Sequence, residues 1–178
     1  MSNVSHQMSR SDENRSNFEA WFGSQLAALA GNRHAGFVVT MVAFPLLERY
    51  LKQSSRAEPN SEPFNDALLR VLPELQTRSN ANLFWSIYRH GLLHNVALSK
   101  ETHGLSHNKP TVEIWPNGQV WLNPDLFAER VLNVIRSDFG TFEKGVSLPT
   151  VSALPVQGIP GAYTPYLGTG MPSGGSRR

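Results

Sequence analysis

The chain of 178 residues contains no cysteine, which excludes both a disulfide framework and a metal site built on thiolates. No apolar run reaches the roughly 18–20 residues that a membrane helix needs. The N-terminus is polar and lacks the charged-then-apolar pattern of a signal peptide. Together these absences predict a cytoplasmic protein with no membrane partner.

Charge is sparse as well. Charged residues make up 17% of the chain, and the net charge at pH 7 is only +2. A balance this close to neutral does not by itself indicate nucleic-acid binding. A single local site could still bind a phosphate-bearing substrate, so the position of each cation matters more than the total.

The composition predicts one domain with two appendages. Residues 1–10 are rich in serine and asparagine and predict a disordered N-terminus. Residues 11–144 predict a single helical domain, since 40% of the chain is hydrophobic and this length can bury one core. Residues 145–178 hold seven of the 14 glycines and five of the 12 prolines, which predicts a tail without packed elements.

Hydrophobic spacing predicts a mainly α protein, a four- to five-helix bundle with one small β-hairpin. The helices are expected over residues 11–30, 34–53, 64–75, 80–99 and 123–144. Pro45 should kink or split the second of them. Residues 100–110 read as a polar loop, and Asn117-Gly118 between two short β-type runs predicts the hairpin.

The helix expected over residues 80–99 carries the strongest functional signal. It is apolar nearly all the way round, so it must be enclosed by neighbours, by a second subunit, or by both. Arg89, His90 and His94 nevertheless lie in its middle. Charge is costly in such surroundings unless it is paired or bound to a ligand. These three side chains are therefore the first candidates for a functional site.

Their chemistry suits RNA cleavage without a metal. That reaction needs a base, an acid and a fixed cation for the charge that develops on the phosphate. Histidine titrates near neutrality, and arginine offers a planar fork for phosphate oxygens. Arg89 and His94 are separated by about 140° and ~7.5 Å along a helix, which is awkward for one tight site. A two-fold axis crossing the helix would bring two copies of each together.

Residues 89–94 read as arginine, a polar residue, three further residues and histidine. Aromatic residues precede the motif, and a loop, a hairpin and a last amphipathic helix follow it. This pattern resembles the HEPN family, the higher eukaryote and prokaryote nucleotide-binding domains. The resemblance implies a four- or five-helix bundle that dimerises through the 80–99 helix. Many HEPN proteins are metal-independent ribonucleases that act as toxins, in phage defence or in RNA processing.

The resemblance also implies roles for individual residues. Arg89 would bind and stabilise the scissile phosphate, His94 would act as general acid or base, and His90 would help orient the site. The expected product carries a 2′,3′-cyclic phosphate, no cofactor is implied, and an antitoxin or activator protein is a further partner to consider. Some HEPN toxins are modified on a tyrosine two residues after the histidine, and Val96 at that position does not support such regulation.

Other interpretations stay open. Arg89 could be a structural arginine paired with Glu113 or Asp138, and the domain could be a non-catalytic nucleotide- or RNA-binding or scaffolding HEPN-like module. The amide of Asn95 could touch substrate or fix the helix. Trp115 and Trp121 could stack on bases or cap the core.

Metal binding is a further alternative. His90 and His94 are four residues apart on the helix, and His103 and His107 repeat this spacing in the following loop. Four histidines could hold zinc or another transition metal. However, no acidic or cysteine partner accompanies them, and the loop gives no clear helical signal.

Overall fold

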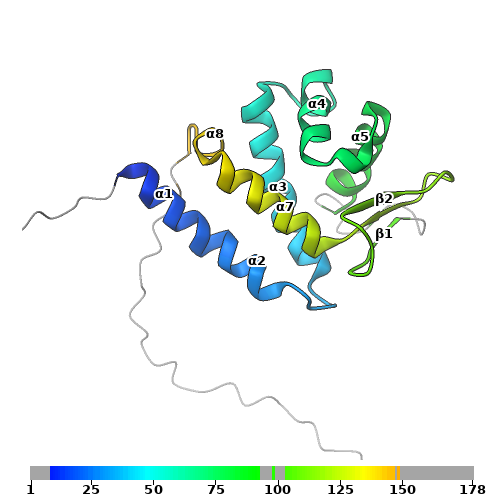
Figure 1. The fold of residues 1–178 in the computed structure, drawn as a ribbon, viewed down its shortest axis with the longest axis horizontal. Helices are drawn as coiled ribbons and strands as arrows, with labels where there is room; N and C mark the ends of the chain where they lie inside the picture. Colours follow the sequence, from blue (N-terminus) through cyan, green and yellow to red (C-terminus); the bar gives the residue numbers. More distant parts are fainter. Residues whose placement is uncertain (1–8, 93–97, 99–102, 147, 149–178) are drawn as a thin grey trace, which may run out of the picture.

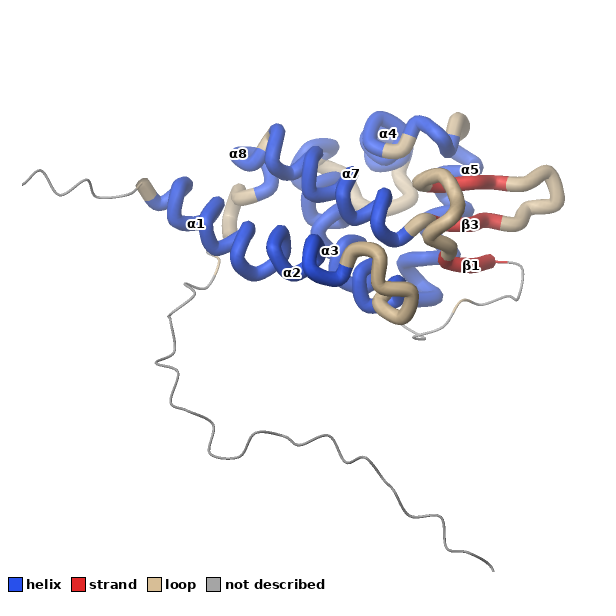
Figure 2. The backbone as a smooth tube through the Cα atoms, turned by 60° about the horizontal axis from the view of Figure 1, so that its bottom comes forward, coloured by secondary structure: helices blue, strands red, loops and turns tan. Residues whose placement is uncertain are grey.

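The computed structural model describes residues 9–92, 98, 103–146 and 148. In this part of the chain, helices surround one core and a small sheet lies at the end of the molecule away from α8 (Figures 1 and 2). The predicted mainly α class is confirmed. The expected appendages, residues 1–10 and 145–178, fall almost entirely outside the described residues, as do His94 and Asn95.

The first long helix is built from three consecutive pieces. α1 (Arg10–Phe18) runs into a π-helical turn (Glu19–Gly23) and then α2 (Ser24–Leu29). Its start is fixed by Ser9, whose hydroxyl accepts a hydrogen bond from the Asp12 backbone N–H at 3.2 Å. The chain then turns at Gly31, where a positive φ of 75° suits glycine.

α3 (Gly36–Ser55) and α7 (Pro124–Ser137) form the central pair of the bundle. α4 (Glu62–Val71) and α5 (Arg78–Trp85) pack beside them, and the short α8 (Phe139–Phe142) follows α7. Aromatic rings fill the centre around Phe44. The rings within about 6 Å of it belong to Phe84, Trp85, Tyr88 and Phe127. No helix in the described ranges is long and apolar enough to cross a bilayer.

Pro45 does not split α3, contrary to one form of the prediction. The helix continues on both sides of it to Ser55. Pro45 lies on the exposed side, whereas Phe44 and Leu47 beside it are fully buried. We attribute the continuity to this burial, which outweighs the one backbone hydrogen bond that proline removes.

The sheet has three strands in the order β1-β3-β2. β2 (Val112–Ile114) and β3 (Val120–Leu122) form the predicted antiparallel hairpin, with Gly118 at a positive φ of 80° in its turn. β1 (His103–Leu105) pairs in parallel with β3, so the prediction of a polar loop over residues 100–110 is wrong here. β1 was missed because a strand of three residues is too short to show an alternating pattern, and its partner β3 is not its neighbour in the sequence.

Gly104 is the residue that lets the indole of Trp121 lie against β1. The two residues are direct partners across the β1–β3 ladder. A Cβ added at Gly104 would overlap the Trp121 ring. Trp121 alternates with the fully buried Val120 and Leu122, so it lies on the sheet face opposite the bundle core. Capping of the core by this tryptophan is therefore not what the structure shows.

The helix that carries Arg89 consists of α5 and a following π-helical turn (Ser86–His90), and it stays helical to Leu92. The described neighbours within one chain do not enclose it on every side, which leaves a second subunit as the predicted cover of the open side. An exposed stripe runs along it, formed by Asn82, Leu83, Ser86 and His90. The other large apolar side chains of this helix, as far as Leu92, are buried: Phe84, Trp85, Ile87, Tyr88 and Leu92.

Candidate functional site around Arg89

Tyr88 fixes the segment that carries Arg89 against the sheet. Its hydroxyl lies 2.9 Å from the carbonyl oxygen of Gly104 and 3.0 Å from that of Val120, one on each of two paired strands. The side chain is fully buried, and this desolvation raises the pKa of Tyr88 far above its ordinary value. Because the phenol keeps its proton, it remains a donor, and the π-helical turn has a defined position relative to the sheet.

Arg89 extends from this turn to α3, where its Nε donates a hydrogen bond to Oε2 of Glu48 at 3.3 Å. The two side chains are 26% and 18% exposed, so the contact is sheltered but reaches solvent. The guanidinium is thus neither loose on the surface nor enclosed in the core. π-Helical turns within α-helices occur frequently at functional sites, and here the turn contains Arg89 itself.

The two acidic partners expected for a structural Arg89 were the wrong ones. The Glu113 carboxylate pairs with Lys109 at 2.7 Å, and this contact lowers the pKa of Glu113. Asp138 accepts a hydrogen bond from the Tyr50 hydroxyl at 3.4 Å. Neither carboxylate is the partner of Arg89, because the fold places Glu48 of α3 beside it instead.

A hollow of about 340 Å³ adjoins the Arg89–Glu48 pair along α3. Its described lining consists of Pro45, Glu48, Arg49, Lys52 and Gln53. Arg49 is anchored there, since it donates to the carbonyl oxygens at Phe142 and Lys144, and burial lowers its pKa. The Lys52 ammonium pairs with Glu58 at 2.6 Å. Cationic groups therefore flank the hollow beside the pair.

Of the other candidate site residues, the structure describes His90 but not His94 or Asn95. His90 lies on the exposed stripe directly after Arg89. His94 and Asn95 lie outside the described residues, so their roles stay predictions. The structure thus brings together Arg89 and Glu48, with His90 next in the chain.

His103 and His107, two of the four histidines considered as metal ligands, make separate polar contacts. Nδ1 of His103 accepts a hydrogen bond from the Val120 backbone N–H at 3.3 Å. Nδ1 of His107 lies 2.8 Å from Oδ2 of Asp125. Within the described ranges, no three histidine, aspartate or glutamate side chains lie close enough to hold a metal ion.

The His107–Asp125 contact belongs to a structural junction. Oδ2 of Asp125 also accepts a hydrogen bond from the Gly31 backbone N–H at 3.0 Å. Asn123 caps α7, because its Oδ1 accepts from the N–H groups of Asp125 and Leu126. The Asp125 carboxylate therefore connects the α2–α3 turn, the loop after β1 and the start of α7.

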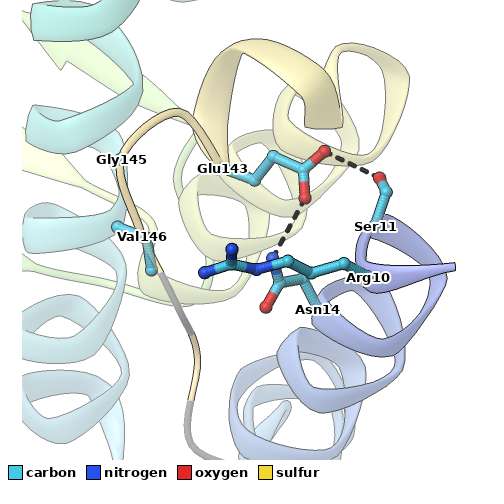
Figure 3. Close-up of a pocket in the computed structure, with 6 residues that line it drawn as sticks. All are labelled: Arg10, Ser11, Asn14, Glu143, Gly145 and Val146. Atoms are coloured by element: carbon cyan, nitrogen blue, oxygen red, sulfur yellow. Dashed lines mark hydrogen bonds between the residues drawn. The ribbon is translucent and has the colours of Figure 1, made fainter.

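A second hollow, of about 590 Å³, lies where α1 meets the segment after α8 (Figure 3). The Glu143 carboxylate accepts hydrogen bonds there from Ser11 at 2.7 Å and from Asn14 at 3.2 Å. Figure 3 shows both hydrogen bonds from α1 to Glu143. These two hydrogen bonds tie the first helix to the end of the helical domain, and none of the candidate residues that the structure describes lines this hollow.

Trp115 is the one tryptophan of the hairpin tip, and it is 39% exposed. The Lys109 ammonium lies 5.0 Å from the centre of its ring, a cation–π contact that leaves part of the ring open to solvent. Base stacking on Trp115 stays a prediction.

Glu48 was missed by reasoning from the sequence alone. It lies 41 residues before Arg89, and no local pattern pairs the two. A signal did exist, because Glu48-Arg49 interrupts an otherwise apolar helix in the same way that Arg89-His90 does. Comparison with known proteins adds no relative: no family model matches the chain, and neither a curated protein nor a solved structure matches it. The HEPN resemblance therefore rests on the motif and the sequence around it.

Proposed function

We propose that this protein is a metal-independent endoribonuclease of HEPN type, active as a homodimer. The observation that carries the proposal is the position of Arg89: a guanidinium held by Glu48 at a sheltered site that still reaches solvent. A cation fixed in advance, where water is partly excluded, is what a developing phosphate charge requires. A toxin, phage-defence or RNA-processing role, with an antitoxin or activator as partner, belongs to the same proposal.

The reaction is an internal transfer. The 2′-oxygen of a ribose attacks the adjacent phosphorus, and one imidazole takes the proton from the 2′-hydroxyl. The bond from phosphorus to the 5′-oxygen breaks, and a second imidazole gives that oxygen a proton. The products are a 2′,3′-cyclic phosphate and a 5′-hydroxyl. Arg89 stabilises the negative charge on the phosphate, and two copies of His94 supply both proton carriers.

The exposed stripe supports the homodimer. Leu83 is 36% exposed and His90 is exposed, on the same helix that carries Arg89. A second copy of this helix would cover the stripe and place two Arg89 side chains near each other. If the site is composite, the specific activity falls when the protein is diluted below the dissociation constant of the dimer. Light scattering over the same concentrations measures the mass directly.

The direct test is RNA cleavage in EDTA by the purified protein and by His94→Ala and Arg89→Ala. Arg130→Ala is the matched control, because Arg130 also pairs with a glutamate and is similarly sheltered, at 33% exposed. We expect cleavage in EDTA by the unmodified protein and by the control, with cyclic phosphate ends detected by mass spectrometry. Cleavage that disappears with the chelator, or persists in both site variants, would contradict the proposal.

A second candidate is a non-catalytic RNA-binding or scaffolding module. The Arg89–Glu48 pair itself favours it, since a structural arginine also finds a carboxylate. In that case a folded protein binds RNA with a strong dependence on salt but cuts no RNA under any condition. Binding without cleavage, lost in Arg89→Ala and kept in Arg130→Ala, would select this function.

A further inference from the structure

The geometry points to Glu48 as the positioning residue of the site: its carboxylate holds Arg89 so that the guanidinium meets the phosphate of bound RNA. This inference rests on the proposed function and adds to it a residue outside the motif helix. Glu48 itself does not contact the reacting atoms.

The contact has the form that positioning requires. An arginine presents five N–H donors on one planar group, and a carboxylate on Nε fixes the orientation of that plane. Here Nε of Arg89 donates to Oε2 of Glu48 at 3.3 Å. Two parallel N–H groups of a guanidinium bind phosphate better than one. The contact with Glu48 matters because it decides which edge of the Arg89 guanidinium faces the substrate.

The support for Glu48 is rigid. It lies in α3, whose neighbouring residues Phe44, Leu47 and Leu51 are fully buried, so the backbone that carries the carboxylate is fixed by the core. Arg89 is fixed from the other side by Tyr88, through its contacts with two strands. Two elements far apart in the sequence therefore define the position of one guanidinium. A catalytic group displaced by about 1 Å can cost 10²-fold in rate.

The charges around Glu48 suit a polyanion. Arg49 and Lys52 lie on the same side of α3 and line the hollow of about 340 Å³ that adjoins the pair. A lone carboxylate at a phosphate site would repel the substrate. Lys52 is itself paired with Glu58, so three cations, Arg89, Arg49 and Lys52, lie near two carboxylates. The surroundings therefore keep a net positive charge while Glu48 orients the guanidinium.

Two variants separate orientation from charge. In Glu48→Gln the amide oxygen still accepts the hydrogen bond from Nε, whereas Glu48→Ala removes this acceptor. We expect cleavage by Glu48→Ala to fall by about 10²-fold in kcat, with a smaller change in KM. Glu48→Gln should recover most of that loss and keep the pH–rate profile of the unmodified protein. Glu74→Ala breaks the Glu74–Arg130 pair, whose side chains are 28% and 33% exposed, and serves as the control.

Other results would overturn the inference. Equal losses in Glu48→Gln and Glu48→Ala, with the acid limb of the pH profile removed, would make Glu48 a general base. A loss in Glu48→Ala that only follows the folded fraction, as in Glu74→Ala, would make the pair structural.

Binding of a 2′-O-methyl RNA, which cannot be cleaved, tests the same inference without activity. We expect Arg89→Ala and Glu48→Ala to weaken binding alike, and Glu48→Gln to weaken it less. If only Arg89→Ala weakens it, Glu48 does not position Arg89, and the proposed function stands without the inference. If Arg89→Ala changes neither binding nor cleavage, the proposed function itself fails and the inference fails with it.

Discussion

The pairs Arg89–Glu48 and His107–Asp125 are alike in exposure and different in what they hold. Their side chains are 26% and 18% exposed in the first pair and 24% and 23% in the second. Asp125 also binds the Gly31 backbone N–H, at the start of α7. Within the described residues, the Glu48 carboxylate accepts a hydrogen bond from Arg89 and from no backbone group.

This difference separates two uses of a sheltered ion pair. A carboxylate that binds backbone from another segment fixes the path of the chain, and its loss should appear as lower stability. A carboxylate that binds one arginine fixes a side chain, and its loss should appear in whatever that arginine does. Burial alone would not distinguish them, since the exposures are nearly equal.

The largest effect is expected at Arg89. Its replacement by alanine removes the fixed cation, and we expect cleavage to fall by about 10²–10³-fold, as for other groups that stabilise developing charge. The melting temperature should change little, because a pair that reaches solvent contributes about 0–1 kcal/mol. Single-turnover cleavage and thermal unfolding of Arg89→Ala and Arg130→Ala measure both quantities. A large loss in both variants would remove the distinction between the two arginines.

Asp125→Ala should have the opposite profile. It leaves the Gly31 N–H without its acceptor and removes the partner of His107, at a cost of about 1–3 kcal/mol in the free energy of unfolding. Cleavage per folded molecule should be unchanged. Urea unfolding gives the free energy, and Asp66→Ala is the control, because Asp66 pairs with the exposed Arg78. Equal costs in the two variants would show that the junction has no special role.

Gly104→Ala tests the strand that links the Tyr88 contact to the loop of His107. The new Cβ overlaps the Trp121 ring, and overpacking of this kind costs about 1–3 kcal/mol. Gly140→Ala is the matched control, since a Cβ there meets nothing within 4 Å. We expect a lower denaturation midpoint for the first variant only. A neutral Gly104→Ala would mean that Trp121 moves aside without cost.

The smallest effect concerns alkaline pH. Because the pKa of Tyr88 is raised in the folded state, the unfolded chain releases this proton first, and stability falls as pH rises above about 10. The slope approaches about 1.4 kcal/mol per pH unit for this one proton. In Tyr88→Phe that slope should be absent, while stability at neutral pH drops by about 0.5–1.5 kcal/mol.

Unfolding measured from pH 8 to 12 compares Tyr88→Phe with Tyr50→Phe. Tyr50 is a milder case, whose pKa is raised by burial and by Asp138. An unchanged alkaline slope in Tyr88→Phe would show that its hydroxyl is not held as described.

Local chemistry predicted much of this fold. Asn117-Gly118 predicted the hairpin, and Asn123 followed by Pro124 predicted the start of α7; the structure confirms both. Such signals act over a few residues, so they can be read directly. The last helix was expected to reach residue 144, but α7 ends at Ser137 and Asp138 leaves the helical conformation before α8.

The features that sequence reasoning missed depend on contacts between distant segments. β1 is three residues long and exists because β3 lies beside it. Glu48 becomes part of the site because α3 packs near the motif helix, and Pro45 is tolerated because its neighbours are buried. Arg89 could be selected from its residue type and surroundings, whereas its partner required the fold.

The most direct test measures cleavage and stability together for Glu48→Ala and Asp125→Ala. We expect the two rankings to be opposite: Glu48→Ala loses cleavage of RNA and keeps its unfolding free energy, and Asp125→Ala loses unfolding free energy and keeps cleavage per folded molecule. If both variants lose stability and activity in the same proportion, the Arg89–Glu48 pair is structural, and its assignment to an RNA-cleaving site is contradicted.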